Sequence, residues 1–197
     1  SLYKLRAKVA ITRLTDWRMG YMESATLEHS FADPRHPSLP ARIWVKGESA
    51  MPEGLLSLDH VLAIRLNLGI PAGAVDATEN ETLLDVGYDL LHAVSFTKGC
   101  YVGQEVTARM HYKSISRKGF YQVVGDAPLP PDATHITIDG KKVGELRSRI
   151  DNQGLVYARF DDLEGQKTAH IGDISVKLTI PEWLQPRYEI FLKNKEA

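Results

Sequence analysis

The chain has 197 residues and a formal net charge of −1, from 24 basic and 25 acidic side chains. Hydrophobic residues make up 43% of it and charged residues 25%, which is typical of a soluble globular protein and excludes disordered and collagen-like classes. Nucleic-acid binders usually carry a basic excess, so the near-neutral balance predicts no direct contact with nucleic acid.

Cys100 is the single cysteine of the sequence. It can form no disulfide within the chain and cannot hold a metal ion or an iron–sulfur cluster alone, so we expect a reducing compartment and no metal site. The seven histidines show no metal-ligand spacing either. No apolar run reaches the ~18 residues of a membrane-spanning helix, and a signal-peptide pattern is missing. Because the chain begins with Ser1 rather than methionine, we expect its start to lie inside a longer protein.

The N-terminal part predicts one strand and one rigid loop. Val9 and Ile11 alternate with polar neighbours, which favours a strand over residues 7–14. Three prolines within residues 31–42 forbid a helix and predict an extended loop. Asp33 and Arg35 in this loop are interpreted as structural, since an aspartate beside a proline commonly builds its own turn.

The clearest helix is predicted from a cap at Ser57 or Asp59 to about Leu68, ending before Gly69 and Pro71. Its expected apolar face carries Leu58, Val61, Leu62 and Leu66. Arg65 lies within this helix, and a surface salt bridge is its expected role. A second short helix is predicted over residues 83–91, weakened by Gly87.

Short strands dominate the rest of the chain. We predict strands over residues 119–124, 134–138, 142–146, 154–160 and 174–180, with a loop over 128–132. Asp139-Gly140 suits a type I′ turn and so predicts a hairpin. This spacing favours a small antiparallel barrel or sandwich, and the change of character places a domain boundary near residue 115.

One octapeptide concentrates chemistry on a single turn: Lys98-Gly99-Cys100-Tyr101-Val102-Gly103-Gln104-Glu105. The two glycines permit a tight turn and close approach of a ligand, and a helix is expected to begin at Gln104. A thiol beside Lys98 and near a helix start is expected to have a lowered pKa. The alternative is a buried Cys100 that acts as a small hydrophobic residue.

The octapeptide resembles the signature of the YgfZ family, a folate-binding branch related to the glycine-cleavage T-protein. The resemblance extends over almost the whole chain. It includes residues 2–9, Asp33-Pro34-Arg35 with Pro37 and Leu39, Arg65 with 68–71, the stretch 94–110, Gly154-Leu155 and Pro181-Glu182-Trp183.

The resemblance implies an α+β protein with a partial T-protein-like folate-binding domain over residues 1–115 and a C-terminal β-barrel over 116–197. It implies tetrahydrofolate, or a derivative, as the cofactor. The implied role is to assist assembly or repair of iron–sulfur proteins, including tRNA-modifying enzymes. Its partners would be iron–sulfur client or assembly proteins. The protein would act as a monomer away from membranes, in the bacterial cytoplasm or in the mitochondrial matrix of a eukaryote.

Two other functions stay open at the level of sequence. An aminomethyltransferase would use tetrahydrofolate in one-carbon transfer, although T-proteins do not usually carry the Cys100–Glu105 string in this form. A third alternative is a module that contacts RNA through its barrel, against which the near-neutral charge argues.

The resemblance implies a cofactor site made of Lys98, Cys100, Tyr101, Gln104, Glu105 and Arg109, with no catalytic residue among them. The stretch from residue 98 to 119 contains five basic residues and one acidic residue, and this positive charge would attract the glutamate tail of a folate. The alternative is a solvated strand edge. Tyr101 would stack on a ring of the ligand, or else belong to the core.

Overall fold

The computed structural model describes residues 10, 12–13, 15–113, 116–165 and 168–196. The chain divides into two compact units, the first containing residues up to 33 together with 40–56, the second residues 34–39 together with 57 onward. The strand predicted over residues 7–14 lies mostly outside the described residues. The domain boundary predicted near residue 115 stays a prediction.

The first unit is a three-stranded antiparallel sheet in the order β1-β3-β2. The strands are β1 (Trp17–Met22), β2 (Ser30–Phe31) and β3 (Ala41–Lys46), so the predicted loop over 31–42 is bounded by strand residues at both ends. One face of the sheet forms a small core of Met22, Ala41 and Ile43, against which Val45 and Leu55 pack.

Helix α1 (Leu58–Asn67) begins and ends as the sequence predicts. The Ser57 hydroxyl accepts a hydrogen bond from the His60 amide at 3.1 Å, and Gly69 adopts a φ of +67° just beyond the helix. Its apolar face is narrower than expected, since Leu58 is 74% exposed while Leu66 is buried. A second helix of one turn, α2 (Gly73–Asp76), follows without having been predicted.

The helix predicted over residues 83–91 is wrong, because this segment forms consecutive turns. Gly87 has a φ of +76°, which interrupts a right-handed helix. A Cβ atom there would lie 2.4 Å from the Trp183 ring, so the glycine allows the indole to pack against the backbone. The leucines that suggested a helix are instead distributed among these turns.

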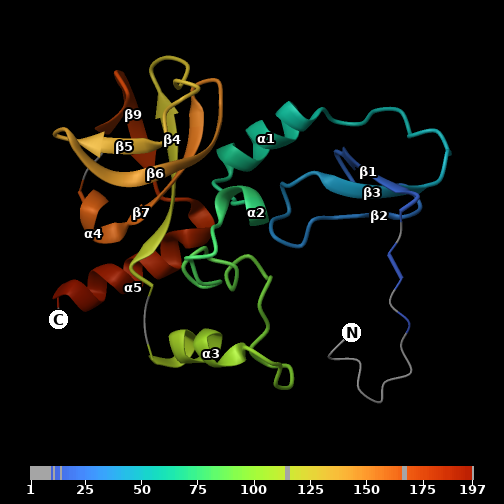
Figure 1. The fold of residues 1–197 in the computed structure, drawn as a ribbon, viewed down its shortest axis with the longest axis horizontal. Coiled ribbons are helices and arrows are strands. Elements are labelled where there is room, and N and C mark those ends of the chain that lie inside the picture. The colour runs from blue at the N-terminus through green and yellow to red at the C-terminus, as the bar shows by residue number, and fades with distance from the viewer. Residues whose placement is uncertain (1–9, 11, 14, 114–115, 166–167, 197) are drawn as a thin grey trace. The chain divides into compact units, whose positions relative to one another are not determined.

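The C-terminal part is a closed antiparallel barrel in the order β4-β7-β6-β5-β8-β9, which confirms the predicted barrel and the α+β class (Figure 1). Its strands are β4 (Lys118–Gly125), β5 (His135–Ile138), β6 (Lys141–Ile150), β7 (Gln153–Arg159), β8 (Thr168–Ile171) and β9 (Ile174–Thr179). The β5–β6 hairpin turns at Asp139 and Gly140, whose φ values of +50° and +75° are those a type I′ turn requires.

Helical segments close the barrel core. Phe160 opens α4 (Phe160–Leu163), which ends the predicted strand one residue early. The 3-10 helix η1 (Glu182–Leu184) and helix α5 (Gln185–Glu196) follow the last strand. The Phe191 ring of α5 lies 5.4 Å from the Phe160 ring, so α5 packs on the same core.

Candidate functional site

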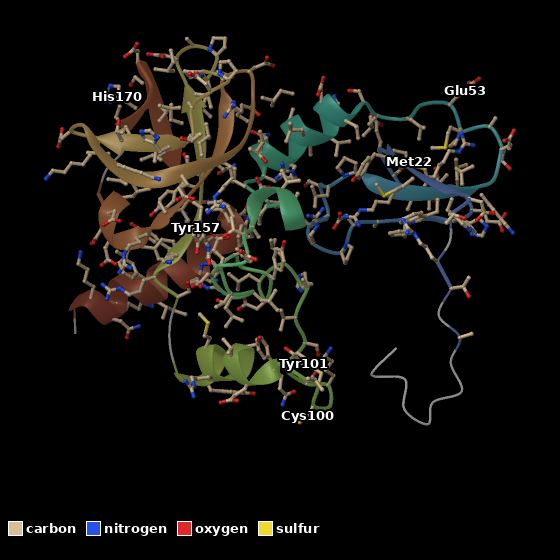
Figure 2. All side chains as sticks on the ribbon, viewed as in Figure 1. Met22, Glu53, Cys100, Tyr101, Tyr157 and His170 are labelled. Carbon is tan, nitrogen blue, oxygen red and sulfur yellow. The ribbon has the colours of Figure 1, made fainter. Side chains whose placement is uncertain are left out.

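The octapeptide forms a turn that leads into helix α3 (Gln104–Lys113), so the predicted helix start is confirmed. The Gln104 side chain closes the turn, because its Oε1 accepts a hydrogen bond from the Tyr101 amide at 2.9 Å. Gly103 has a φ of +88°, which a residue with a side chain rarely adopts. Figure 2 shows Cys100 and Tyr101 on this turn.

The Cys100 side chain is exposed, so the alternative of a buried, hydrophobic cysteine does not hold. A Cβ atom at Gly99 would have open space around it, and Val102 is 76% exposed. The thiol is therefore accessible to another molecule.

The Tyr101 ring lies close to a cation of the same turn. The Lys98 Nζ atom lies 4.8 Å from the centroid of the Tyr101 ring, which is a cation–π contact. Tyr101 is 40% exposed and therefore not a core residue. Glu105 and Arg109 form an i,i+4 ion pair at 3.6 Å with both side chains largely exposed, which contributes little to stability. The six predicted site residues thus lie on one exposed turn and the helix that follows it.

A stack of two rings ties the segment before the turn to helix α3. The Phe96 and His111 rings lie 3.6 Å apart at an interplanar angle of 13°. Sequence reasoning missed this pair, because the two rings are separated by the whole octapeptide. On α3, Met110 and His111 also line a pocket with Leu90 and Ile190, whose lining includes no octapeptide residue.

Part of the predicted positive charge near the octapeptide is neutralised. Arg109 pairs with Glu105, and Arg117 bonds both carboxylate oxygens of Asp161 at 3.1 and 2.5 Å. The hydrogen bond from Arg117 holds the pKa of Asp161 below its ordinary value.

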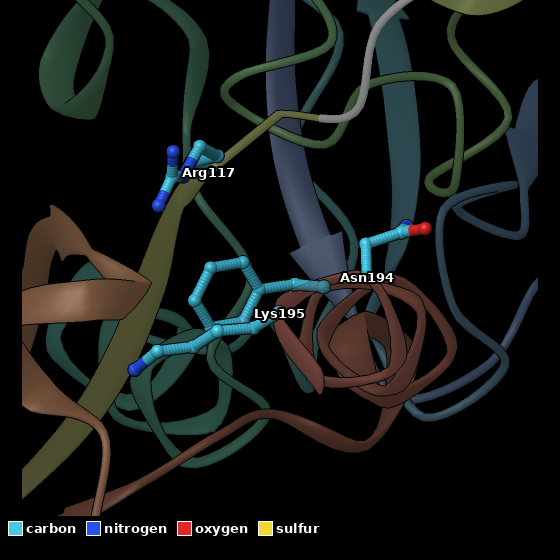
Figure 3. Close-up of a pocket in the computed structure, with 4 residues that line it drawn as sticks. Arg117, Asn194 and Lys195 are labelled. Atoms are coloured by element: carbon cyan, nitrogen blue, oxygen red, sulfur yellow. The ribbon is translucent and has the colours of Figure 1, made fainter. Parts of the chain in front are cut away.

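Arg117 also lines a small pocket with Phe191, Asn194 and Lys195 (Figure 3). Its second cation, Lys195, is paired with Glu164. Both cations of this pocket are thus already compensated by acids of the chain, and it offers little free charge to a ligand.

Arg65 does not form the predicted surface salt bridge. It is 7% exposed, and its Nη1 atom lies 2.5 Å from Asp76 Oδ2, while Asp76 is fully buried. Arg65 also donates to the Ser148 hydroxyl of β6 at 3.0 Å, and that hydroxyl donates to Asp76. This buried cluster ties α1 and α2 to the barrel. The charge within an apolar helix was the sequence feature that pointed to it.

Asp33 and Arg35 make contacts within the chain, as their structural interpretation predicts. Asp33 is buried and accepts from Arg42 at 2.8 Å, and Arg35 donates to the Pro71 carbonyl at 3.1 Å. Across the described part of the chain, no group of three or more His, Cys, Asp or Glu side chains is placed to hold a metal ion. Among the helices of the described residues, none combines the length and the hydrophobicity of a membrane-spanning helix.

Comparisons with known proteins agree with the barrel. Residues 117–186 match the family model described as the C-terminal beta-barrel domain of CAF17. The chain is 30% identical over 211 residues to the mitochondrial iron-sulfur cluster assembly factor IBA57 of Mus musculus, an alignment that covers 93% of this chain and 59% of the mouse protein. It is 31% identical over 163 residues to the Homo sapiens protein of the same name, covering 77% of this chain and 46% of that protein.

A fungal relative is also named as an iron–sulfur cluster assembly factor. The IBA57 homologue of Mycosarcoma maydis is 33% identical over 159 residues, which covers 70% of this chain and 38% of the relative. The chain spans about half the length of the curated relatives it matches. The coarser part of the resemblance, a relation to iron–sulfur cluster assembly factors, is therefore confirmed.

Proposed function

We propose that this chain is part of a YgfZ-like factor that binds tetrahydrofolate and assists the assembly or repair of iron–sulfur proteins. The observation that carries the proposal is the similarity to factors named for iron–sulfur cluster assembly, which extends over 93% of the chain for the mouse relative. The exposed octapeptide supports it, because its side chains are available to a ligand or a partner protein.

The geometry fits a transient role for Cys100. Iron–sulfur clusters are usually held by four thiolates, and this chain supplies one. The cluster is then the cargo of the reaction, held by a client or assembly protein, and Cys100 contributes at most one ligand during transfer. Lys98, whose ammonium lies over the Tyr101 ring, provides a positive charge on the same turn as the thiol.

The folate part of the proposal uses the other side chains of the turn. Tyr101 offers an exposed aromatic ring for stacking, and Lys98 and Arg109 offer cations for the carboxylates of a glutamate tail. Since Arg109 is paired with Glu105 only at 3.6 Å, a ligand carboxylate can compete for it. The proposed clients include tRNA-modifying enzymes, and the proposed location is the mitochondrial matrix if the source is eukaryotic or the cytoplasm if it is bacterial.

The iron–sulfur role is tested in cells depleted of their own assembly factor of this type. The full-length protein should restore the activities of iron–sulfur enzymes, measured per amount of each enzyme protein. If these activities stay at the depleted level while the protein accumulates normally, the proposed role is wrong.

Folate binding is tested separately, by calorimetric titration of the full-length protein with tetrahydrofolate. Saturable binding that weakens in Tyr101→Ala supports the cofactor. Absence of binding at millimolar ligand removes the folate from the account and leaves the assembly role standing. Formation of methylene-tetrahydrofolate from an aminomethyl donor would instead identify an aminomethyltransferase.

A further inference from the structure

A second site lies on the outside of the barrel, in a pocket beside β6, β7 and the start of β4. The outer position follows from strand alternation, since Val156 and Ala158 belong to the barrel core while Tyr157 between them packs in a separate cluster. No octapeptide residue lines this pocket. Three carboxylates and four cations line it, the cations being Lys118, Lys142, Arg147 and Arg159.

Two of these cations are poorly compensated. Lys118 and Arg159 are direct partners in the β4–β7 register and therefore lie on the same face of the sheet. Lys118 has no ion pair with any described residue, and Arg159 approaches Asp161 at 3.6 Å, a carboxylate that already bonds Arg117 through both oxygens. Like charges placed directly opposite each other are unfavourable, so a negative group between them would be stabilised.

Two of the carboxylates are already engaged by Arg147. Its Nη2 atom contacts Glu81 Oε1 at 2.5 Å and Glu145 Oε2 at 2.9 Å, and the Arg147 side chain is only 10% exposed. Both acids contact the same nitrogen, Nη2. The Nε–H of Arg147 is buried and has no acceptor among the described residues. Lys142 adds a further contact to Glu145 at 3.5 Å. These acids are therefore poor ligands for an additional cation.

A second donor without a partner lies next to Arg147. The Tyr157 hydroxyl is buried and has no hydrogen-bond partner among the described residues, and the Arg147 guanidinium lies 5.3 Å from the Tyr157 ring centroid. Burial raises the pKa of Tyr157 well above its ordinary value, so the hydroxyl keeps its proton and acts as a donor. A buried donor without an acceptor costs about 1–3 kcal/mol. Both groups thus retain an unused hydrogen-bond donor for an oxygen acceptor.

We propose that this pocket binds the oxyanion of a small molecule, a phosphate or a carboxylate group. Lys118 and Arg159 supply the opposing charge, and Arg147 and Tyr157 supply the donors that lack acceptors. The site is separate from the octapeptide and does not depend on the iron–sulfur role. Phosphate and carboxylate share the chemistry that these groups recognise, and the experiment distinguishes them.

The test is a titration of the ¹⁵N-labelled full chain with inorganic phosphate or with glutarate, at constant ionic strength. The Nε–H signals of arginines are followed by NMR. We expect saturable shifts of the Arg147 signal, and an affinity about tenfold lower in the double variant Lys118→Gln/Arg159→Gln. Saturation by one anion alone assigns the site to that chemistry.

Two further variants separate binding from folding. Lys177→Gln removes an exposed lysine of β9 that does not line the pocket, and it should bind like the parent. Tyr157→Phe should weaken binding without lowering the free energy of unfolding, because the lost hydroxyl has no hydrogen-bond partner among the described residues. The proposal is overturned if neither anion saturates, or if the double variant binds as tightly as Lys177→Gln.

Discussion

Replacing Asp76 by alanine should be among the most destabilising single changes in the second unit. Asp76 is fully buried and accepts from the Arg65 guanidinium, the Ser148 hydroxyl and the Ala72 amide, the last at 2.7 Å. Removing the carboxylate leaves the guanidinium buried without its counter-charge. It also leaves two donors without their acceptor.

The size of the effect follows from these contacts. Removing one partner of a buried ion pair costs about 3–5 kcal/mol, because the remaining charge is uncompensated. Ser148→Ala removes one hydroxyl from the cluster and should cost about 1–2 kcal/mol. The double variant Arg65→Met/Asp76→Leu removes both charges, so it should be more stable than Asp76→Ala even though it changes more atoms.

Urea unfolding measures these differences. Trp183 packs against Gly87 in the second unit, so its fluorescence reports on that unit when Trp17 and Trp44 are replaced by phenylalanine in every variant. Two results would contradict this: a loss of less than about 1 kcal/mol in the free energy of unfolding of Asp76→Ala, or a double variant no more stable than Asp76→Ala.

Three further changes test other parts of the fold. Gly87→Ala places a Cβ 2.4 Å from the Trp183 ring and should lower the melting temperature more than Gly165→Ala. At Gly165 φ is similarly positive, but a Cβ would meet no described atom beyond the adjacent residues within 4 Å; equal losses would contradict the packing argument. Burial raises the pKa of Tyr121 well above its ordinary 10.0, so the native state retains a proton that the unfolded chain releases, and the free energy of unfolding should fall above about pH 10. Tyr121→Phe should flatten this decline, by up to about 1.4 kcal/mol per pH unit, and an unchanged alkaline profile would rule the tyrosine out. Gln104→Ala removes the side-chain acceptor of the Tyr101 amide and should speed hydrogen exchange of that amide; unaltered protection would show that this hydrogen bond is dispensable.

The barrel was predictable because its determinants are local. Alternating strands and the Asp139-Gly140 turn specify the hairpin without reference to distant residues. The same holds for α1, whose cap at Ser57 and stop at Gly69 both lie next to the helix.

The errors arise where a distant residue decides the local structure. The segment over 83–91 contains enough leucine to suggest a helix, but Gly87 takes a positive φ and accepts the Trp183 ring from the far end of the chain. Arg65 is buried because Asp76 and Ser148, 11 and 83 residues away, provide its partners. No periodicity within α1 carries that information.

In the candidate site, too, the features set by neighbouring residues were predictable and those set by distant residues were not. Gln104 closes its own turn, so the position of the turn and the start of α3 could be read from the octapeptide. Exposure of Cys100 depends on what packs around the turn, and the sequence left both a buried and an accessible thiol open.

A role of the accessible thiol in iron–sulfur assembly is tested with Cys100→Ala in the full-length protein. The measurement is the activity of iron–sulfur enzymes in cells that lack their own factor, with the parent protein and the variant expressed at equal levels. We expect that Cys100→Ala fails to restore these activities, although its unfolding in urea matches that of the parent because the side chain is exposed. Full restoration by the variant would contradict a role for the thiol.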